Sequence, residues 1–248
     1  MMECFGLSDT GCVRTNNEDY FQVAPELGLC VLADGMGGAR AGEKASQLAV
    51  ETVIQRVRDS GRRDSQALLE AIEAANREVL GMARADPTLE GMGTTLVAVL
   101  DLDDEILVAS VGDSRAYLLD QESFRVVTED QSWVNEVGRP MGLDEGTLKT
   151  HPLRHVLTMA IGAGAHLVVN CYMQPWKPGS LLLLSSDGLH GVVPLERIEE
   201  IMRSSNGEGR ALEVKCRRLI ELAREAGGPD NITAVLVRRS VWPPAPTP

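Results

Sequence analysis

Hydrophobic and polar residues in the first half of the chain follow two periods, which predict strands first and helices after them. Apolar runs predict strands at residues 4–11 and 19–33, interrupted by the polar turn RTNNED. A helical pattern then runs from Ala41 to Arg58. A second helix is predicted in SQALLEAIEAANREVLGMARA, where one face carries Leu68, Leu69, Ile72, Ala75 and Val79.

The second half repeats this order of strands followed by helices. A β-rich block with DLDDE as a hairpin turn is predicted at Thr94–Asp101, Glu105–Val111, Arg115–Asp120 and Phe124–Thr128. Residues 131–165, which contain several glycines and prolines, are predicted to be irregular. SLLLLSSDG predicts another buried strand, two helices follow at Leu195–Ser204 and Arg210–Ala226, and NITAVLVRR predicts a closing strand.

The helices therefore come in two consecutive pairs between blocks of strands. Helices alternating with single strands would predict a doubly wound parallel sheet, whereas paired helices favour a layered α+β domain with mainly antiparallel sheets. No internal repeat and no linker divides the pattern, so we predict one domain over residues 1–240. The proline-rich residues 241–248 are predicted to form a disordered tail or the stub of a linker.

The composition is that of an ordinary globular protein with an excess of acidic residues. The 248 residues include 36 Asp and Glu against 24 Lys and Arg, which gives a formal net charge of −12. This charge argues against nucleic acid or an anionic membrane as a partner. It fits solvated acidic faces, and it also fits a cluster of carboxylates that needs cations.

The cysteines and the N-terminal residues bear on the compartment. Five scattered cysteines without a CxxC pair indicate free thiols in a reducing environment. None of them has an arginine six residues later, so a phosphatase loop with a cysteine nucleophile is not supported. No basic segment followed by an apolar run marks a signal peptide, and no apolar stretch reaches the ~20 residues of a membrane-spanning helix. We therefore expect a cytoplasmic protein.

Four aspartates share one local pattern: Asp34, Asp113, Asp187 and Asp230 each stand at the predicted end of a strand with a glycine within two residues. Any one of them alone is typical of a turn, because Asp and Gly favour turns. Strand ends of one sandwich can converge, however, and converging carboxylates repel each other unless cations lie between them. The four together predict a cation site.

Oxygen ligands select hard ions such as Mg²⁺, Mn²⁺ or Ca²⁺, and no calcium loop of the EF-hand type occurs in the sequence. His151 and His155 have the spacing of a helical zinc pair, but Pro152 and the irregular context argue against a helix there. We therefore predict two Mg²⁺ or Mn²⁺ ions that share Asp34. Gly35 would let its backbone carbonyl approach one of them closely.

A pair of hard ions can activate water and stabilise an in-line displacement at phosphorus. Such a site needs a cation that holds the phosphate, and the guanidinium of Arg14 matches phosphate oxygens with two hydrogen bonds. A solvated arginine on a surface turn is the alternative. Arg14 precedes Glu18 and Asp19, which could hold metal-bound waters.

Seven stretches between about Phe5 and Val237 resemble, in order, the metal-dependent protein phosphatases of the type 2C (PPM) family in their bacterial form. They are RTNNEDY, VLADGMGGARAGEKAS, GMGTTLVAV, ASVGDSRAYLL, HPLRHVLTMAIG, LLLLSSDGL and GPDNITAVLV. The resemblance implies a four-layer α-β-β-α sandwich. It also implies hydrolysis of phosphoserine and phosphothreonine monoesters by direct attack of a metal-bridged water, which reverses kinase signalling.

The resemblance also implies roles for the acidic residues. Asp34 would bridge two metal ions, and Gly35 would give its carbonyl oxygen to one of them. Asp187 and Asp230 would complete the shell of the other ion. Asp113, together with Asp187, would hold a third ion.

Around these ligands, the resemblance implies that Glu18 and Asp19 act through water and that Arg14 binds the substrate phosphate. Residues 131–160 would form a flap beside the site. Eukaryotic members carry a histidine, a proposed general acid, where this chain has Met36. Since methionine donates no proton, water must protonate the leaving group here, or protonation is not needed.

The sequence argues against one other function and leaves two open. A nucleotide-binding loop fails because the glycines after Asp34 do not extend to GxGxxG. A catalytically silent or single-partner binding module on the same fold remains the alternative, as does a phosphatase of small molecules. The expected partners are phosphorylated proteins and a cognate serine/threonine kinase, and we expect a monomer that binds neither nucleic acid nor membranes.

Overall fold

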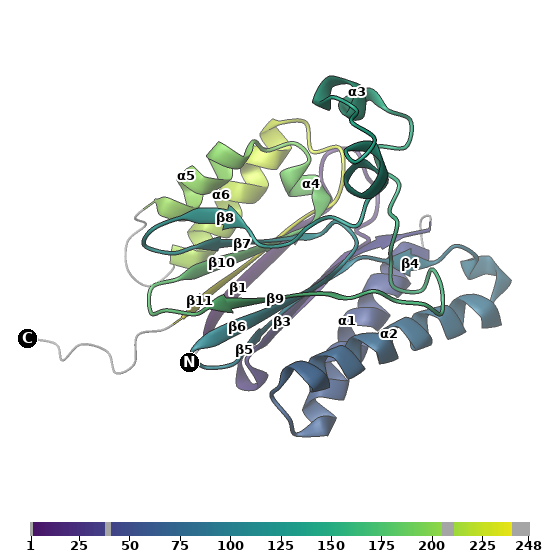
Figure 1. The fold of residues 1–248 in the computed structure, drawn as a ribbon, viewed down its shortest axis with the longest axis horizontal. Coiled ribbons are helices and arrows are strands. Elements are labelled where there is room, and N and C mark those ends of the chain that lie inside the picture. The colour runs from purple at the N-terminus through teal and green to yellow at the C-terminus, as the bar shows by residue number, and fades with distance from the viewer. Residues whose placement is uncertain (1, 38–40, 205–210, 240–248) are drawn as a thin grey trace, which may run out of the picture.

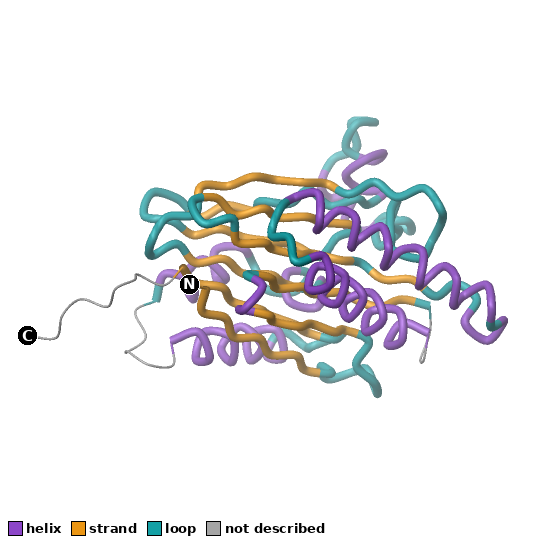
Figure 2. Tube along the Cα trace, turned by 90° about the horizontal axis from the view of Figure 1, so that it is seen from below, coloured by secondary structure: helices purple, strands orange, loops and turns teal. Residues whose placement is uncertain are grey.

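The computed structural model describes residues 2–37, 41–204 and 211–239 (Figure 1). The predicted tail at 241–248 lies outside these residues. Two antiparallel sheets lie face to face, and helices cover the outer face of each (Figures 1 and 2). None of the described helices is long and apolar enough to cross a membrane.

The first sheet has five strands in the order β1-β11-β10-β7-β8. They are β1 (Met2–Asp9), β7 (Arg115–Leu119), β8 (Phe124–Val126), β10 (Leu181–Ser185) and β11 (Ile232–Arg239). Every neighbouring pair is antiparallel, and β11 lies between β1 and β10.

The second sheet has the path β2-β3-β5-β6-β9, and the short β4 pairs with β3 off this path. Its strands are β2 (Asp19–Ala24), β3 (Leu29–Met36), β4 (Gly93–Thr94), β5 (Leu96–Asp101), β6 (Glu105–Val111) and β9 (Asn170–Pro175). All of these pairs are antiparallel as well.

Each helix pair covers one sheet. The second sheet is covered by α1 (Ala41–Ser60) and α2 (Ser65–Ala85), and the first by α5 (Leu195–Arg203) and α6 (Ala211–Glu225). The short α4 (Asp187–His190) follows β10, and α3 (Glu145–Thr150) lies in the segment beyond β8. The predicted four-layer α+β sandwich is confirmed.

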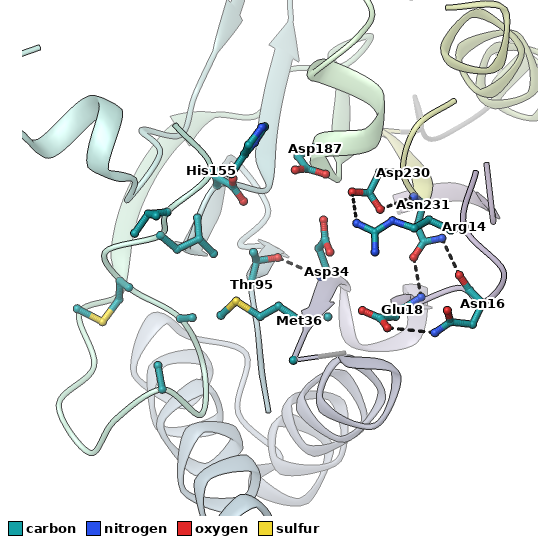
Figure 3. Close-up of a pocket in the computed structure, with 18 of the residues that line it drawn as sticks. Arg14, Asn16, Glu18, Asp34, Met36, Thr95, His155, Asp187, Asp230 and Asn231 are labelled. Atoms are coloured by element: carbon teal, nitrogen blue, oxygen red, sulfur yellow. Dashed lines mark hydrogen bonds and ion pairs between the residues drawn. The ribbon is translucent and has the colours of Figure 1, made fainter. Parts of the chain in front are cut away.

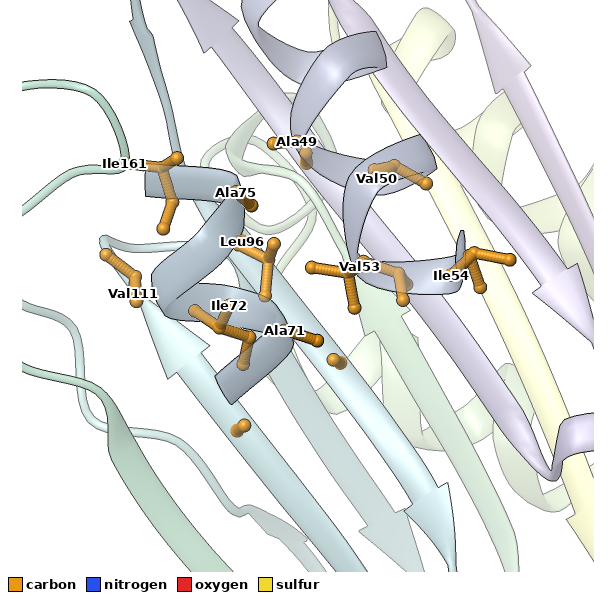
Figure 4. Close-up of a cluster of buried hydrophobic side chains, with 14 of the residues drawn as sticks. Ala49, Val50, Val53, Ile54, Ala71, Ile72, Ala75, Leu96, Val111 and Ile161 are labelled. Atoms are coloured by element: carbon orange, nitrogen blue, oxygen red, sulfur yellow. The ribbon is translucent and has the colours of Figure 1, made fainter. Parts of the chain in front are cut away.

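Three apolar layers hold the sandwich together. One lies between α1, α2 and the second sheet, and Figure 4 shows Val53, Ile72 and Leu96 packed there. Another lies between the sheets, and the third lies under α5 and α6. In β3, Val31 faces the helices and Leu32 faces the other sheet, so both faces of the strand are buried. This explains why its sequence is continuously apolar and does not alternate.

Several predicted boundaries differ from the observed ones. The strand predicted at 19–33 is two strands, since Pro25–Leu27 form a 3-10 turn that Gly28 closes with a φ of 66°. The irregular residues 131–165 contain the π-helical turn Val134–Gly138 as well as α3. The strand β9 was not predicted, because its half-exposed edge position leaves no apolar run.

One correction concerns the site directly. Asp34 was predicted at the end of its strand, but β3 continues through Met36. Asp34 pairs with Asp19 of β2, and Gly35 pairs with Thr94 of β4. Asp34 therefore belongs to the sheet, which fixes its backbone on both sides.

Candidate active site

A cavity of about 760 Å³ opens at one end of the sandwich, where strands of both sheets end or begin (Figure 3). Seven of the eight predicted site residues line it: Arg14, Glu18, Asp34, Gly35, Asp113, Asp187 and Asp230. The eighth, Asp19, is buried and does not line the cavity. Residues that are far apart in the sequence thus meet in one place.

Asp34 is held by hydrogen bonds from the neighbouring strand. Its N–H donates to Thr95 Oγ1 at 3.0 Å, and its carbonyl oxygen accepts from Thr95 N at 2.9 Å and from Thr94 Oγ1 at 2.8 Å. Burial, followed by the charges of Asp19 and Asp187, raises the pKa of the Asp34 carboxyl well above its usual range. A negative charge at this position is therefore costly without a cation beside it.

Gly35 is required by packing. Its N–H donates to the Glu18 carbonyl oxygen at 3.1 Å. A Cβ at this position would lie 2.1 Å from the Gly42 carbonyl oxygen, in the first turn of α1, and 2.7 Å from that of Glu18. The glycine thus lets α1 approach β3, a reason for its presence that adds to the predicted exposure of its carbonyl.

Asp187 and Asp230 are brought together by a close contact between α4 and the start of β11. A Cβ on Gly188 would lie 1.9 Å from the carbonyl oxygen of Asn231, so only glycine fits there. Burial, followed by the charge of Asp230, raises the pKa of Asp187.

Asn231 was not predicted as a site residue, although it follows Asp230 in GPDNIT. Its Oδ1 accepts a hydrogen bond from the Glu18 N–H at 2.8 Å (Figure 3). Its Nδ2 donates to the carbonyl oxygens of Thr10 at 3.0 Å and Asn16 at 2.9 Å. A single side chain therefore fixes the loop that carries Arg14 against the strand that follows Asp230.

Asp113 and Asp19 are two further carboxyls of the site with a raised pKa. Burial, followed by the charges of Asp187 and Asp130, raises the pKa of Asp113 to about 7. Burial also raises the pKa of Asp19 to about 7, although its Oδ2 accepts hydrogen bonds from Ser186 at 2.7 Å and Thr233 at 2.6 Å. The buried Oδ1 of Asp19 has no hydrogen-bond partner among the residues that the structure describes.

Arg14 lies at the rim of the cavity. Its Nη2 donates to Asp230 Oδ2 at 2.8 Å, and its side chain is 48% exposed (Figure 3). The guanidinium therefore faces both the solvent and the carboxylate cluster.

The segment 155–160, within the predicted flap, contributes cavity residues that were not predicted as site residues. His155 and Met159 line the cavity from this side, and Met36 and Thr95 line it from the sheet. No helix forms over residues 151–155, as predicted, and the His151 ring stacks on Trp133 with centroids 4.1 Å apart.

The donor set fits hard divalent cations in chemistry and charge. The acidic side chains offer oxygen ligands, burial raises the pKa of four of them, and Asp19 Oδ1 is an orphaned buried acceptor. Within residues 2–37, 41–204 and 211–239, no three Asp, Glu, His or Cys side chains enclose one common point at ligand distance. Asp230 directs one carboxylate oxygen at Arg14.

The family model of protein phosphatase 2C matches residues 13–215. The chain belongs to the protein phosphatase 2C family. It is 36% identical over 247 residues to the serine/threonine phosphatase Stp of Listeria innocua, a match that covers 94% of each chain. It is also 37% identical over 235 residues to the serine/threonine protein phosphatase PstP of Mycobacterium tuberculosis, which covers 92% of this chain and 43% of that protein.

Solved structures of the protein phosphatase 2C family resemble the whole fold. The crystal structure of M. tuberculosis PstP superimposes with a TM-score of 0.87 at 33% identity and covers 97% of this chain and 99% of that one. The PstP catalytic domain in complex with two manganese ions gives a TM-score of 0.84 at 34% identity, with the same coverage. The predicted family, its sandwich fold and the enzyme class, a protein serine/threonine phosphatase, are confirmed.

Proposed function

We propose that this phosphatase uses the carboxylate cavity as its active site and depends there on divalent metal ions. The observation that carries the proposal is the cluster of buried carboxyls with raised pKa around Asp34, with Arg14 beside them at the rim. The two manganese ions in the structure of the PstP catalytic domain support it.

In this proposal Asp34 would be shared by two ions, Mn²⁺ or Mg²⁺, and Gly35 would give its carbonyl oxygen to one of them. Asp187 and Asp230 would hold the other. When bound, these ions supply an activated water and offset the charge that develops in the displacement at phosphorus. We assign Asp113, with Asp187, to a third and weaker ion.

The remaining residues bind the substrate phosphate, hold water or line the cavity. Arg14 donates two charge-assisted hydrogen bonds to the substrate phosphate, for which it must leave or share Asp230. Glu18 lines the cavity and holds water beside the carboxylate cluster. Asp19 is buried and does not line the cavity, so it acts on the cluster only through its charge. Met36 lines the cavity but has no proton to give, so water protonates the leaving serine or threonine oxygen.

The substrates of this site are phosphoserine and phosphothreonine in proteins, and its activity reverses that of a cognate kinase. We assign the catalytic function to one domain, residues 1–240, acting as a cytoplasmic monomer. The named activities of the Listeria and mycobacterial relatives support the substrate class.

The test is hydrolysis of p-nitrophenyl phosphate and of a phosphothreonine peptide in Mn²⁺, in Mg²⁺ and in EDTA. We expect turnover with either metal and none in EDTA. Asp34→Asn should abolish both metal binding and turnover, whereas Asp59→Asn, an exposed carboxylate on α1, should change neither. Asp113→Ala should leave two bound ions by calorimetry and lower turnover at limiting Mn²⁺.

Turnover that persists in EDTA would contradict the metal-dependent proposal. A protein that binds Mn²⁺ but hydrolyses neither substrate would support the alternative, a silent binding module on the same fold.

A further inference from the structure

A second hollow, of about 520 Å³, lies between α2 and residues 165–167. The proposed function does not use it. The chain that forms its outer wall passes beside α2 before it enters β9 (Figure 1). We refer to this hollow, lined among others by Arg77, Gly81, Arg84 and His166, as the α2 groove.

The wall of the α2 groove continues directly into the wall of the catalytic cavity. Ala160 and Ala163 line the cavity, and Ala165 and His166 line the groove. Ala163 and Ala165 are two residues apart, which is at most about 7 Å along an extended chain. A bound extended segment of a few residues is therefore long enough to reach from the cavity into the groove.

Hydrogen bonds fix this shared wall. Asn76 of α2 donates from Nδ2 to the Gly164 carbonyl oxygen at 2.9 Å, and its Oδ1 accepts from the Gly162 N–H at 2.7 Å. Ile161 exchanges two backbone hydrogen bonds with Thr94 and is fully buried against α2 (Figure 4). The groove therefore exists before any partner binds.

The α2 groove carries two exposed arginines. Arg77 and Arg84 lie two helical turns apart on one face of α2. Gly81 between them leaves open space where a side chain would stand. Arg77 is 68% exposed and pairs at 3.8 Å with Glu73, the acidic residue that also lines the groove. Arg84 has no ion pair with any residue that the structure describes.

We propose that the α2 groove binds acidic side chains of the phosphoprotein substrate, next to the phosphorylated residue. The proposal rests on the function proposed above for the cavity. Two exposed guanidinium groups, of which only that of Arg77 has a long ion pair among the described residues, are complementary to carboxylates, and a chain of net charge −12 otherwise repels acidic segments. The groove thereby selects phosphorylation sites in acidic sequence.

The test compares four phosphothreonine peptides that carry Asp or Glu before the phosphothreonine, after it, on both sides or on neither side. Exposed pairs of this kind are worth up to ~1 kcal/mol each, or about fivefold. We expect the best acidic peptide to exceed the neutral one about tenfold in kcat/KM, mainly through KM. The advantage should fall with added salt.

Arg77→Glu combined with Arg84→Glu should abolish this advantage while leaving p-nitrophenyl phosphate, which does not reach the groove, unaffected. A peptide with lysines at the same positions should become the better substrate of this variant. Arg217→Glu combined with Arg218→Glu makes the same change of charge on α6, on the opposite helix layer, and should leave the peptide preference intact.

Equal kcat/KM for acidic and neutral peptides, or an equal loss of preference in the α6 variant, would overturn the groove proposal. Absence of hydrolysis of every substrate would instead overturn the function proposed for the cavity. In that case fluorescence anisotropy of a labelled acidic peptide still decides the groove, since binding weakened by the α2 variant and not by the α6 variant supports it. Binding that neither variant weakens overturns it.

Discussion

Arg14 lies between the solvent and the carboxylate cluster, because its guanidinium pairs with Asp230 while nearly half of its side chain is exposed. Removing it should weaken ground state and transition state together, since both carry charge on the phosphoryl oxygens. We expect Arg14→Ala to cost about 2–3 kcal/mol in kcat/KM, mostly as a higher KM. Steady-state kinetics on a phosphothreonine peptide measures this.

Two controls separate phosphate binding from metal binding at Arg14. Arg14→Lys should recover part of the loss, because an ammonium keeps the charge but not the two parallel hydrogen bonds. Mn²⁺ affinity, measured by calorimetry, should not fall in either variant. A wild-type KM in Arg14→Ala would place the phosphate elsewhere.

Single site residues could be predicted where their chemistry requires a recognisable pattern of neighbouring residues. An aspartate beside a glycine after an apolar run identified Asp34 and Asp187 as members of a possible cluster. Asn231 left no such trace, because its role depends on three backbone groups of the Thr10–Glu18 loop, far away in the chain. The packing requirement for glycine at position 35 could not be predicted either, because the atoms that a side chain would meet belong to Gly42 and Glu18.

Among the elements, α4 and the start of β11 meet in the tightest contact of the site. Gly188→Ala would place a methyl group within 1.9 Å of a backbone carbonyl, which cannot swing away as a side chain could. We expect a loss of about 1–3 kcal/mol in the free energy of unfolding. Turnover should fall further, because Asp187 and Asp230 flank the contact. Denaturant unfolding and peptide kinetics measure the two effects.

Gly81→Ala is the matched control for that substitution. It adds the same methyl group near the C-terminal end of α2, where nothing beyond the neighbouring residues and backbone of the helix lies within 4 Å. Alanine favours a helix over glycine by up to ~1 kcal/mol, so this variant should be at least as stable as the wild type. Equal stability of both variants would show that α4 and β11 separate easily.

The order and type of most elements followed from periodicity, because both helix pairs are amphipathic and the central strands are apolar on both faces. The misses have physical causes. The edge strand β9 forms because β6 offers it hydrogen bonds, and its own sequence shows no buried run. The extension of β3 through Met36 depends on pairing with β4. The glycine-rich sequence after Asp34 gives no sign of this pairing.

For the molecule as a whole, the raised pKa values of Asp19 and Asp113 link stability to pH and metal. A carboxyl whose pKa rises from 3.8 to about 7 on folding stabilises the fold below about pH 4 and loses that contribution as the pH rises through about 7. In EDTA, the melting temperature should therefore be lower at pH 8 than at pH 5.5. Mn²⁺ should raise it more at pH 8, because ligands must lose their protons to bind metal.

Differential scanning calorimetry at the two pH values, with and without Mn²⁺, makes this comparison. Asp113→Asn removes one of the titrating groups and should reduce the pH dependence in EDTA. A metal-free protein that becomes more stable between pH 5.5 and 8 would contradict the raised pKa values.

The family and the four layers of the whole molecule could be predicted, because the seven motifs and the two helix pairs can be recognised in the amino-acid sequence. The cavity as a shape could not, since it arises where two sheets end together. The α2 groove could not either, because its walls come from α2 and residues 165–167, which only tertiary packing brings together.

The position of β11 between β1 and β10 has a consequence for folding during synthesis. On the ribosome, β1 is made among the first residues, yet its hydrogen-bonding neighbour emerges among the last of the described chain. Pairing across such a separation makes folding slow, and a half-made chain leaves the edges of β1 and β10 bare. Asp230 lies two residues before β11, so the same segment of chain completes both the carboxylate cluster and the first sheet. On the function proposed above, we expect a nascent chain to acquire phosphatase activity only after β11 has been made.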